Sequence, residues 1–469
     1  MTDATVERLS TYAERFCFED VPPVVVHQVK RLIVDSMGCG LAAFHADPVR
    51  AARDLARGVT SASAATILGT RAKTTPDLAA FVNGTMVRYL DFNDSYNGKD
   101  IAHPSDNIPV VMAAGEASGA TGRDIITAVA LAYEVQAAWA DSFQLESGGA
   151  WDQAAYAAIS TPLGAGKAMG LTRNQLAEAL RISVVSSMTL GEARRGTISH
   201  WKAAAVPNAG RNGVFAALLA QRGMTGPPEV FSGSHGFFAG VTNIQVGLAP
   251  MAKEPGYSGA FRLMESRVKR FPAGFVAQTA IEGAIEAREA LGIADSDQIA
   301  HVYIRTFESG KRIMAGDPTR WHPKTRETAD HSMPYVVACA LRFGTLEPAH
   351  FDDAVLHDAR LLDLMHRIEV VQDAECDAAW PEAILNIVSV QTADGREHTV
   401  RVPYYTGHFK RPMSDADLEG KFRRLTDGLL RPARQEEALR CVWGLDEADT
   451  LADVMAALVL ESLVTPLEA

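Results

Sequence analysis

Near its C-terminal end the chain contains a stretch that reads Ala383-Ile-Leu-Asn-Ile-Val-Ser-Val-Gln-Thr-Ala-Asp-Gly-Arg-Glu-His-Thr-Val-Arg-Val402. Apolar residues alternate on both sides of Asp394-Gly395, a dipeptide typical of tight β-hairpin turns. This stretch therefore predicts two antiparallel strands. Alternating runs at 301–307 and 367–371 predict two more strands. Helical runs at 276–291 and 334–342 lie among them, so we expect a compact α+β domain over residues 266–405.

The rest of the chain is predicted to be helical. Residues 1 to about 265 contain successive apolar runs near the helical period, and residues after Tyr405 return to this pattern through Val459. Because 469 residues are too many for one core, we expect at least two domains. The sequence thus predicts a mostly α protein, with a large all-helical domain formed by 1–265 plus 406–469. The clearest helical runs are 24–44, 77–90, 108–119, 124–142 and 174–190.

The bulk composition excludes several classes of protein. The net charge is −12 and no basic cluster occurs, which argues against nucleic acid as a partner. No apolar run approaches the roughly 18 residues that span a membrane, and the N-terminal residues do not resemble a signal peptide. We therefore expect a cytoplasmic protein with no membrane partner. The five cysteines lack Cys-x-x-Cys spacing, so we expect reduced thiols and no iron–sulfur cluster.

The segment Tyr89–Asn107 is a polar island between apolar, alanine-rich runs. It contains Asp91, Asn93, Ser95 and His103, and a proline after the histidine restricts the backbone there. A positioned imidazole can act as an acid or a base near neutral pH. The carboxylates could orient it, or the island could be a solvated loop with caps and turns. Its spacing matches no recognised metal-ligand motif, so we predict no metal.

Three further segments carry candidate residues. The first, 191–202, concentrates Arg194 and Lys202 in an acidic chain, which suits a substrate bearing carboxylates, although a solvated charged loop would look the same. The second, 267–272, places Lys269 at the proposed domain junction, where ligand sites often form, but also where an ordinary linker would lie. The third is Thr328-Ala-Asp-His-Ser-Met-Pro-Tyr335, which supplies His331 and Tyr335 before an apolar helix. We expect N-capping and a substrate contact there rather than a nucleophilic triad.

No cofactor motif accompanies these segments, so we predict no cofactor. One histidine-bearing loop, two cationic segments and one His/Tyr segment suit proton abstraction next to a carboxylate that Lys and Arg hold. The chain also resembles the MmgE/PrpD family, which includes 2-methylcitrate dehydratase, cis-aconitate decarboxylase and iminodisuccinate epimerase. The resemblance rests on Asp91-Phe-Asn-Asp-Ser with His103-Pro-Ser-Asp, Ser199-His-Trp-Lys202, Lys269-Arg-Phe-Pro272, Ala329-Asp-His-Ser-Met-Pro-Tyr335 and Gly407-His408.

The resemblance implies a homodimer in which an all-helical domain and a smaller α+β lid domain enclose an active site that needs no metal or nucleotide. Asp91, Ser95, His103, Lys202 and Lys269 match the family's active-site positions, and Tyr335 falls in the lid motif. One departure is that Gln153 stands where many members have a histidine. Glutamine cannot transfer a proton as imidazole does.

We therefore predict a hydro-lyase that removes water from a hydroxy-di- or tricarboxylate such as 2-methylcitrate. The predicted catalytic residues are Asp91, His103, Lys202 and Lys269. The alternatives are a decarboxylase, an epimerase on a related dicarboxylate, or a non-catalytic polycarboxylate binder. The predicted substrate contacts are Asn93, Ser95, Gln153, Arg194, His331 and Tyr335.

Overall fold

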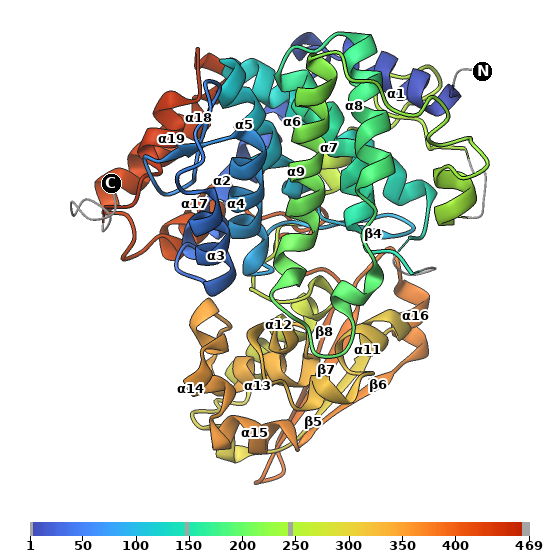
Figure 1. Cartoon of the computed structure of the whole chain (residues 1–469). Helices are drawn as coiled ribbons and strands as arrows, with labels where there is room; N and C mark the ends of the chain where they lie inside the picture. The colour runs from blue at the N-terminus through green and yellow to red at the C-terminus, as the bar shows by residue number, and fades with distance from the viewer. Residues whose placement is uncertain (1–2, 146–149, 243–246, 462–469) are drawn as a thin grey trace.

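The computed structural model describes residues 3–145, 150–242 and 247–461. Figure 1 shows a large helical part above a smaller part that combines helices with a sheet. The prediction of a mostly α protein with a smaller α+β domain is confirmed. Among the described residues, no helix is both long and apolar enough to cross a lipid bilayer.

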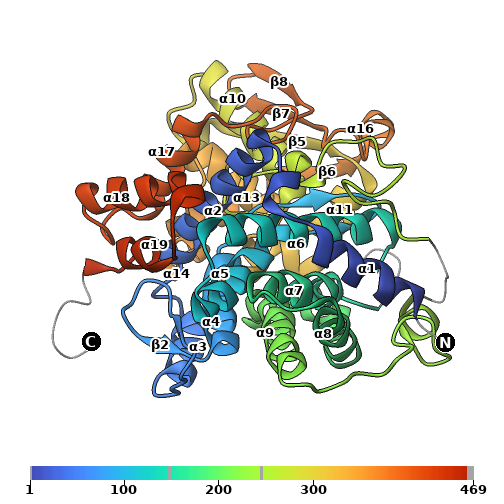
Figure 2. The same ribbon diagram turned by 90° about the horizontal axis from the view of Figure 1, so that it is seen from above.

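The large part is built from helices at both ends of the chain. In Figure 2 the C-terminal helices lie against the N-terminal ones. The Lys421 ammonium joins them, because it donates to Asp35 Oδ1 at 2.6 Å and to the Phe92 carbonyl at 2.9 Å. The N-terminal helices are α1 (Ala4–Arg15), α2 (Pro23–Ala42), α3 (Asp47–Ala56), α4 (Pro76–Tyr89), α5 (Asn107–Ser118), α6 (Gly122–Ser142), α7 (Ala154–Ala168), α8 (Arg173–Ser186) and α9 (Trp201–Gln221). The C-terminal helices are α17 (Asp415–Leu425), α18 (Pro432–Trp443) and α19 (Ala452–Ala457).

Residues 1–265 are less uniformly helical than the sequence predicts. Two short antiparallel pairs interrupt the helices: β1 (Ala65–Thr66) with β2 (Lys73–Thr74), and β3 (Tyr96–Asn97) with β4 (Ile101–Ala102). The described residues between 222 and 261 are mostly irregular. Glycines and a Pro-Pro pair in that region disfavour a continuous helix. Hence the all-helical description holds for the core of this part and not for its connections.

The lid contains one four-stranded sheet with the strand order β6-β5-β7-β8. β7 (Asn386–Thr392) and β8 (Glu397–Val402) form the predicted hairpin, and Gly395 has a φ of 87° in its turn. β5 (Ile299–Thr306) pairs with β7 in the antiparallel sense and with β6 (Ile368–Gln372) in the parallel sense. The four predicted strands are therefore confirmed.

Helices of the lid complete a second hydrophobic core. Helices α10 (Gln278–Ala290) and α13 (Met333–Phe343) pack against the sheet and correspond to the two predicted helical runs. This core draws its residues from Phe271 to Tyr405. The domain boundaries at 265/266 and 405/406 remain a prediction. The other lid helices are α11 (Glu308–Met314), α12 (Arg326–Ala329), α14 (Asp353–Leu356), α15 (Ala359–Met365) and α16 (Ala374–Ala379).

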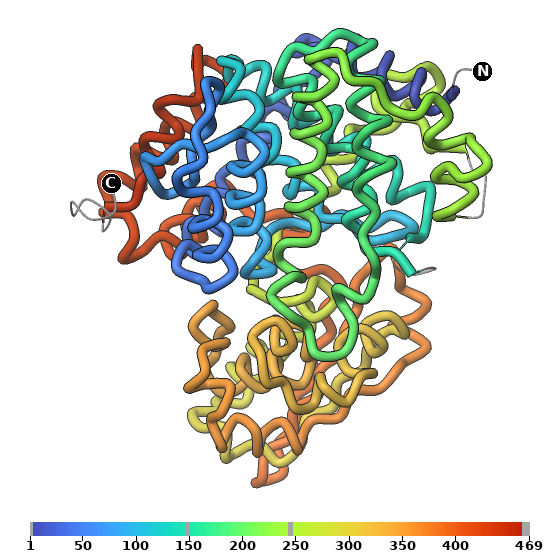
Figure 3. The backbone as a smooth tube through the Cα atoms, viewed as in Figure 1, coloured from blue at the N-terminus to red at the C-terminus, as the bar shows by residue number. Residues whose placement is uncertain are grey.

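Backbone hydrogen bonds join the segments that run between the helical part and the lid. Arg267 exchanges backbone hydrogen bonds with Ser95, and the Val268 amide donates to the Gly407 carbonyl at 2.9 Å. In Figure 3 the connection between α8 and α9 also reaches the lid. There the Ile198 amide donates to the Thr328 hydroxyl at 3.3 Å. These contacts hold the lid against the segments that carry the predicted site.

Candidate active site

A cavity of about 220 Å³ lies where the helical part meets the lid. Both parts contribute to its lining, and so does the segment that connects them. Its charge is predominantly cationic, which suits an anionic ligand. The ionisable and amide side chains of its lining include Arg88, Asp91, Asp100, His103, Gln153, Arg194, Arg195, Lys269, Arg312, Asp317, Arg320 and His331.

Asp91 lies in a tight turn directly after α4. Its φ of 50° is in the left-handed region, which few residues other than glycine, asparagine and aspartate adopt readily. The Arg88 guanidinium, from the last turn of α4, contacts Asp91 Oδ1. Burial favours the neutral acid, but Lys269, Lys202 and Arg88 hold the pKa of Asp91 well below its usual range. Asp91 is therefore a buried carboxylate with several cationic neighbours.

His103 is a neutral imidazole on the same polar island. Its Nδ1 lies 2.6 Å from the backbone carbonyl oxygen of Asp94. A carbonyl only accepts hydrogen bonds, so the hydrogen lies on Nδ1 and Nε2 keeps a lone pair. Burial, with Arg88 and Lys269 nearby, holds the pKa of His103 well below its usual value. His103 can thus accept a hydrogen bond in the cavity but is poorly placed to carry a positive charge.

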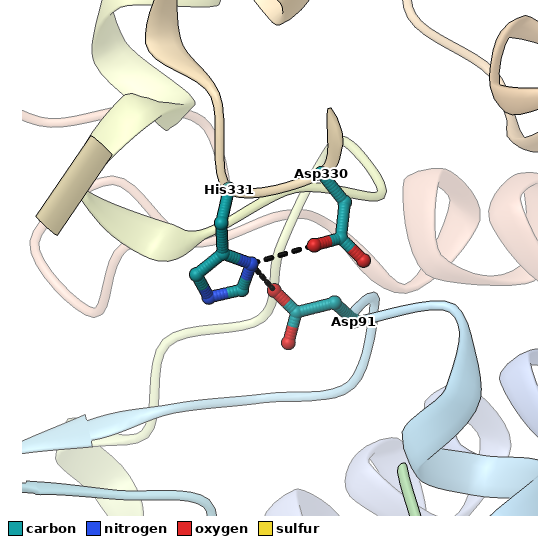
Figure 4. A group of neighbouring side chains, drawn as sticks. All are labelled: Asp91, Asp330 and His331. Atoms are coloured by element: carbon teal, nitrogen blue, oxygen red, sulfur yellow. Dashed lines mark hydrogen bonds and ion pairs between the residues drawn. The ribbon is translucent and has the colours of Figure 1, made fainter. Parts of the chain in front are cut away.

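The lid supplies a second imidazole with a different partner, as Figure 4 shows. His331 Nδ1 lies 2.6 Å from Asp330 Oδ1 and 3.7 Å from Asp91 Oδ2. The Lys202 ammonium is 2.6 Å from the same Asp330 oxygen and 3.0 Å from His331 Nδ1. Since a carboxylate only accepts, the 2.6 Å contact with Asp330 places the hydrogen on Nδ1, and the Lys202 ammonium then donates to Asp330 and not to the ring.

His331 lines the cavity. Its Nε2 lies beside Gly274, where an added Cβ would be 3.7 Å from Nε2 and only 2.8 Å from Met314 Sδ, so the glycine lets the Met314 side chain pack next to the ring. Burial and Lys202 lower the pKa of His331 to about 4, which makes it neutral at pH 7. Asp330, which orients the ring, can stabilise an imidazolium when the ring gains a proton.

Lys269 brings a buried ammonium group to the Asp91 backbone. Its Nζ donates to the Asp91 carbonyl at 2.8 Å and lies 3.1 Å from Asp91 Oδ1. Burial lowers the pKa of Lys269 to about 8. The group is therefore charged at neutral pH, yet it gives up a proton more readily than an exposed lysine.

The two carboxylates and His331 also have to be considered as metal ligands. Asp91, Asp330 and His331 can each offer one ligand atom, with these atoms within 4.8 Å of one another. However, the ammonium groups of Lys202 and Lys269 already contact the two carboxylates. Arg88 adds a third positive charge next to Asp91. This excess of cations makes the donor set a poor fit for a divalent ion.

The other predicted site residues divide into two groups. Gln153 lines the cavity at the start of α7, and so does Arg194, whose Nε lies 2.5 Å from Asp152 Oδ2. In the part of the chain that the structure describes, Asn93, Ser95, Lys202 and Tyr335 are not among the residues that line the cavity. Residues 146–149, shortly before Gln153 in the sequence, lie outside the described residues.

Those four residues instead have partners or surroundings within the protein. The Asn93 amide donates to the Ser105 hydroxyl at 2.9 Å, and the Lys202 ammonium donates to Asp330 Oδ1 at 2.6 Å. Ser95 joins the backbone pair with Arg267. The Tyr335 hydroxyl donates to the His350 carbonyl at 2.5 Å inside the lid core. The Asn93 amide and the Tyr335 hydroxyl are thus bonded within the fold, whereas the buried Ser95 hydroxyl has no hydrogen-bond partner among the described residues. A substrate contact from these three residues stays a prediction.

Sequence reasoning missed the arginines at 88 and 320 as site residues. Arg88 lies within a helical run and Arg320 within a short turn, so neither belongs to a recognisable motif. Asp330 stands in the quoted lid motif, where its position next to the predicted histidine was the available signal. The predicted N-cap in that motif is confirmed, because the Ser332 hydroxyl accepts from the Tyr335 amide at 3.2 Å.

Comparisons with known proteins agree with this arrangement. The MmgE/PrpD N-terminal domain model matches residues 7–246, and the MmgE/PrpD C-terminal domain model matches residues 271–447. The chain is 28% identical over 443 residues to a 2-methylcitrate dehydratase of Cupriavidus necator, and the match covers 89% of each protein. It is 30% identical over 402 residues to a 2-methylcitrate dehydratase of Escherichia coli K12, covering 81% of each. It is 26% identical over 440 residues to a cis-aconitate decarboxylase of Homo sapiens, covering 91% of this chain and 88% of the relative. The chain belongs to the MmgE/PrpD family.

Proposed function

We propose that this protein is a lyase that removes water from a hydroxy-di- or tricarboxylate related to 2-methylcitrate. The observation that carries this proposal is the pair formed by Asp330 and His331, which faces the same cationic cavity as Lys269. An oriented neutral imidazole supplies a base, and a lysine with a lowered pKa supplies an acid. The similarity to 2-methylcitrate dehydratases supports the same class of reaction.

In the proposed reaction, the substrate carboxylate next to the acidic carbon lies near Lys269 and Arg88. Positive charge there stabilises the enolate that develops as the adjacent C–H bond breaks. Because Asp91 already neutralises part of this charge, the cation pair is held in place before substrate binds. Such preorganised charge lowers the barrier more effectively than mobile charge in solvent.

We assign the removal of the α proton to His331 Nε2. The proton passes to Nε2, and the imidazolium that forms is stabilised by its Nδ1–H bond to Asp330. His103 is the weaker candidate for a base, because its Nδ1 partner is an uncharged carbonyl and Arg88 and Lys269 oppose positive charge there. Its Nε2 instead accepts a hydrogen bond from the substrate hydroxyl and orients it.

We assign protonation of the leaving hydroxyl to Lys269. The electron pair of the broken C–H bond forms the new C=C bond, the C–O bond breaks, and the departing oxygen takes a proton from the Lys269 ammonium to leave as water. His331 then loses its extra proton and Lys269 regains one, so no net proton is gained or lost. With a pKa of about 8, Lys269 is suited to donate near neutral pH.

The remaining finer predictions are part of the same proposal. The reaction needs no metal, because Lys202, Lys269 and Arg88 take the place that a divalent ion would have beside the two carboxylates. We also propose a cytoplasmic homodimer. In favour of the dimer, Trp201 and Phe215 are 47% and 52% exposed on α9. They are separated by about four helical turns and so lie on one face of that helix.

A screen of hydroxy-di- and tricarboxylates, including both series of 2-methylcitrate stereoisomers, tests the proposal. Formation of a conjugated double bond is followed by ultraviolet absorbance, with and without EDTA. We expect turnover of at least one hydroxy-tricarboxylate that EDTA does not reduce. Exchange of the α proton without loss of water or carbon dioxide would indicate an epimerase instead, and release of carbon dioxide would indicate a decarboxylase. Binding without any of these reactions would indicate a non-catalytic binder.

A further inference from the structure

The most unusual charge in the cavity belongs to Arg320 of the lid. It lies in the short 3-10 helix η8 (Pro318–Trp321) and is only 5% exposed. Its guanidinium has no carboxylate of the described residues within 4.0 Å. Its Nε and Nη1 atoms have no hydrogen-bond partner among the described residues. A buried guanidinium in this state is costly unless a ligand compensates it.

Three other cations of the cavity that are buried or nearly so have carboxylate partners, which sets Arg320 apart. Arg88 and Lys269 contact Asp91, and Arg194 contacts Asp152. All three partners are carboxylates within the fold. Within the described ranges the protein therefore supplies a carboxylate partner for each of these groups but none for Arg320.

Two carboxylates influence Arg320 from a distance, but each has other bonds. Asp317 accepts from the Thr319 amide at 2.8 Å and from its hydroxyl at 2.7 Å. Asp330 Oδ1 accepts hydrogen bonds from Lys202 and His331. Burial consequently outweighs both of them and lowers the pKa of Arg320.

The position of Arg320 is tied to that of the proposed base. Its amide donates to the Asp317 carbonyl at 2.9 Å, which closes the turn. The Ser332 hydroxyl, next in sequence to His331, donates to the Arg320 carbonyl. The Ser332 side chain thus connects the backbone of Arg320 to the segment that carries His331. A ligand held by Arg320 would be positioned relative to His331 Nε2.

From these observations we infer that Arg320 binds a carboxylate of the substrate that does not take part in the reaction. Its planar guanidinium can form two parallel hydrogen bonds to a carboxylate, which satisfies the unbonded Nε and one Nη atom. This contact selects polycarboxylates over acids that lack the distant carboxylate. The inference takes the position of the reacting carbons from the proposed function, while the binding of a carboxylate by Arg320 does not depend on it.

Calorimetric titration with tricarballylate, a tricarboxylate without a hydroxyl group, tests the inference independently of turnover. Arg320→Met keeps the length of the side chain without its charge, and Arg320→Lys keeps the charge without the fork. We expect Arg320→Met to weaken tricarballylate binding roughly tenfold to a hundredfold, the scale of one charged hydrogen-bonded pair. The affinity of Arg320→Lys for tricarballylate should lie between those of the unmodified protein and Arg320→Met. The affinity of Arg320→Met for succinate should fall by a smaller factor. Arg401→Met, which removes a 56% exposed lid arginine, is the matched control and should bind as the unmodified protein does.

Thermal unfolding separates a binding role from a structural one. Because the unpaired charge is costly, Arg320→Met should unfold at the same temperature as the unmodified protein or at a higher one in the absence of ligand. Tricarballylate should raise the unfolding temperature of the unmodified protein and raise that of the variant much less. A lower unfolding temperature for the free variant, together with unchanged affinity, would show that Arg320 is structural and would overturn the inference.

The outcomes also separate this inference from the proposed function. If no hydroxy acid is dehydrated but Arg320→Met still loses tricarballylate affinity, the carboxylate contact stands and the reaction is wrong. If dehydration occurs and Arg320→Met keeps the KM and the affinity of the unmodified protein, the inference alone fails. It also fails if the unmodified protein does not bind tricarballylate.

Discussion

The island at 89–107 and the lid turn at 317–335 each bring one buried imidazole to the cavity, but they hold it differently. His103 gives its Nδ1 hydrogen to a backbone carbonyl, whereas His331 gives it to the Asp330 carboxylate. Both rings are neutral at pH 7. In both the hydrogen lies on Nδ1, so the lone pair of Nε2 can accept a hydrogen bond or a proton. Of these two rings, only the lid imidazole donates its Nδ1 hydrogen directly to a carboxylate, which can stabilise the proton that the ring would gain.

Local polarity alone therefore does not identify the base. The island is a conspicuously polar segment of the sequence, yet many of its side chains bind one another or neighbouring helices. Asn93 bonds Ser105, and the Asp94 carboxylate accepts from the Ser105 amide at 3.1 Å and from the Tyr133 hydroxyl at 3.0 Å. The island therefore acts largely as a rigid scaffold that presents Asp91 and His103. The lid turn is less conspicuous but contributes a base and an unpaired guanidinium.

The largest expected effect comes from exchanging the lid imidazole. His331→Asn can keep the hydrogen bond to Asp330 but cannot take a proton. It should lower kcat by roughly a hundredfold to ten-thousandfold, the range for removing a general base. His357→Asn, at an exposed lid histidine, is the control and should leave kcat unchanged. Steady-state kinetics on the substrate found in the screen measure both, and a kcat within threefold of the unmodified value for His331→Asn would remove the role of base from the lid.

A second test removes the charge that both regions share. Asp91→Asn retains a residue that tolerates the left-handed backbone but no longer balances Arg88 and Lys269. The pKa of Lys269 should fall further, so less of the proposed acid is charged at pH 7. We expect kcat to drop roughly tenfold to a hundredfold, by the scale of losing one charged partner. Activity that recovers at lower pH would identify the acid as the affected group, while a loss that is independent of pH would contradict that explanation.

The pH dependence of kcat/KM sharpens the assignment of base and acid. His331 has to be neutral to accept a proton, and Lys269 has to be charged to donate one. Activity should therefore fall as the pH decreases below about 4, where His331 is protonated, and as it rises above about 8, where Lys269 loses its proton. In Lys269→Gln the decline at high pH should disappear along with most of the activity. A plateau that extends unchanged to pH 10 would exclude Lys269 as the acid.

The smallest expected effect concerns the connection between the two regions. Gly407 has a φ of 107°, and a Cβ there would lie 2.1 Å from the Val268 carbonyl oxygen. Gly407→Ala should therefore lower the free energy of unfolding by about 1–3 kcal/mol, the usual range for a strained backbone. Gly395→Ala, in the exposed hairpin turn, shares the positive φ but has no atom within 4 Å of the added Cβ, so it separates strain from collision. Equal losses in chemical denaturation would show that the close approach at Gly407 does not matter.

Much of the fold could be predicted from the sequence because its signals are local. Thr121 and Thr172 both begin helices with capping boxes, and Asp394-Gly395 forms the hairpin turn. The parallel pairing of β5 with β6 could not be predicted, since about 60 residues separate these strands along the chain and no turn signal links them.

The site could be predicted only where sequence neighbours carry the chemistry. Asp91, His103, Lys269 and His331 stand in motifs, and the fold brings all four to one cavity. Tyr335 stands in a motif as well, but the register of α13 turns its ring into the lid core. The distinction between a paired and an unpaired arginine depends on contacts between distant segments, so no sequence pattern could separate Arg320 from other lid arginines.

The most direct test of His331 as the base compares two rates for a substrate that carries deuterium on its acidic carbon. One rate is the release of deuterium to water, and the other is the formation of the unsaturated product. If His331 is the base, His331→Asn should lose both rates together, whereas His103→Asn should still release deuterium but form product more slowly. Release of deuterium by His331→Asn at the unmodified rate, with the loss confined to His103→Asn, would show that the base lies on the island and not on the lid.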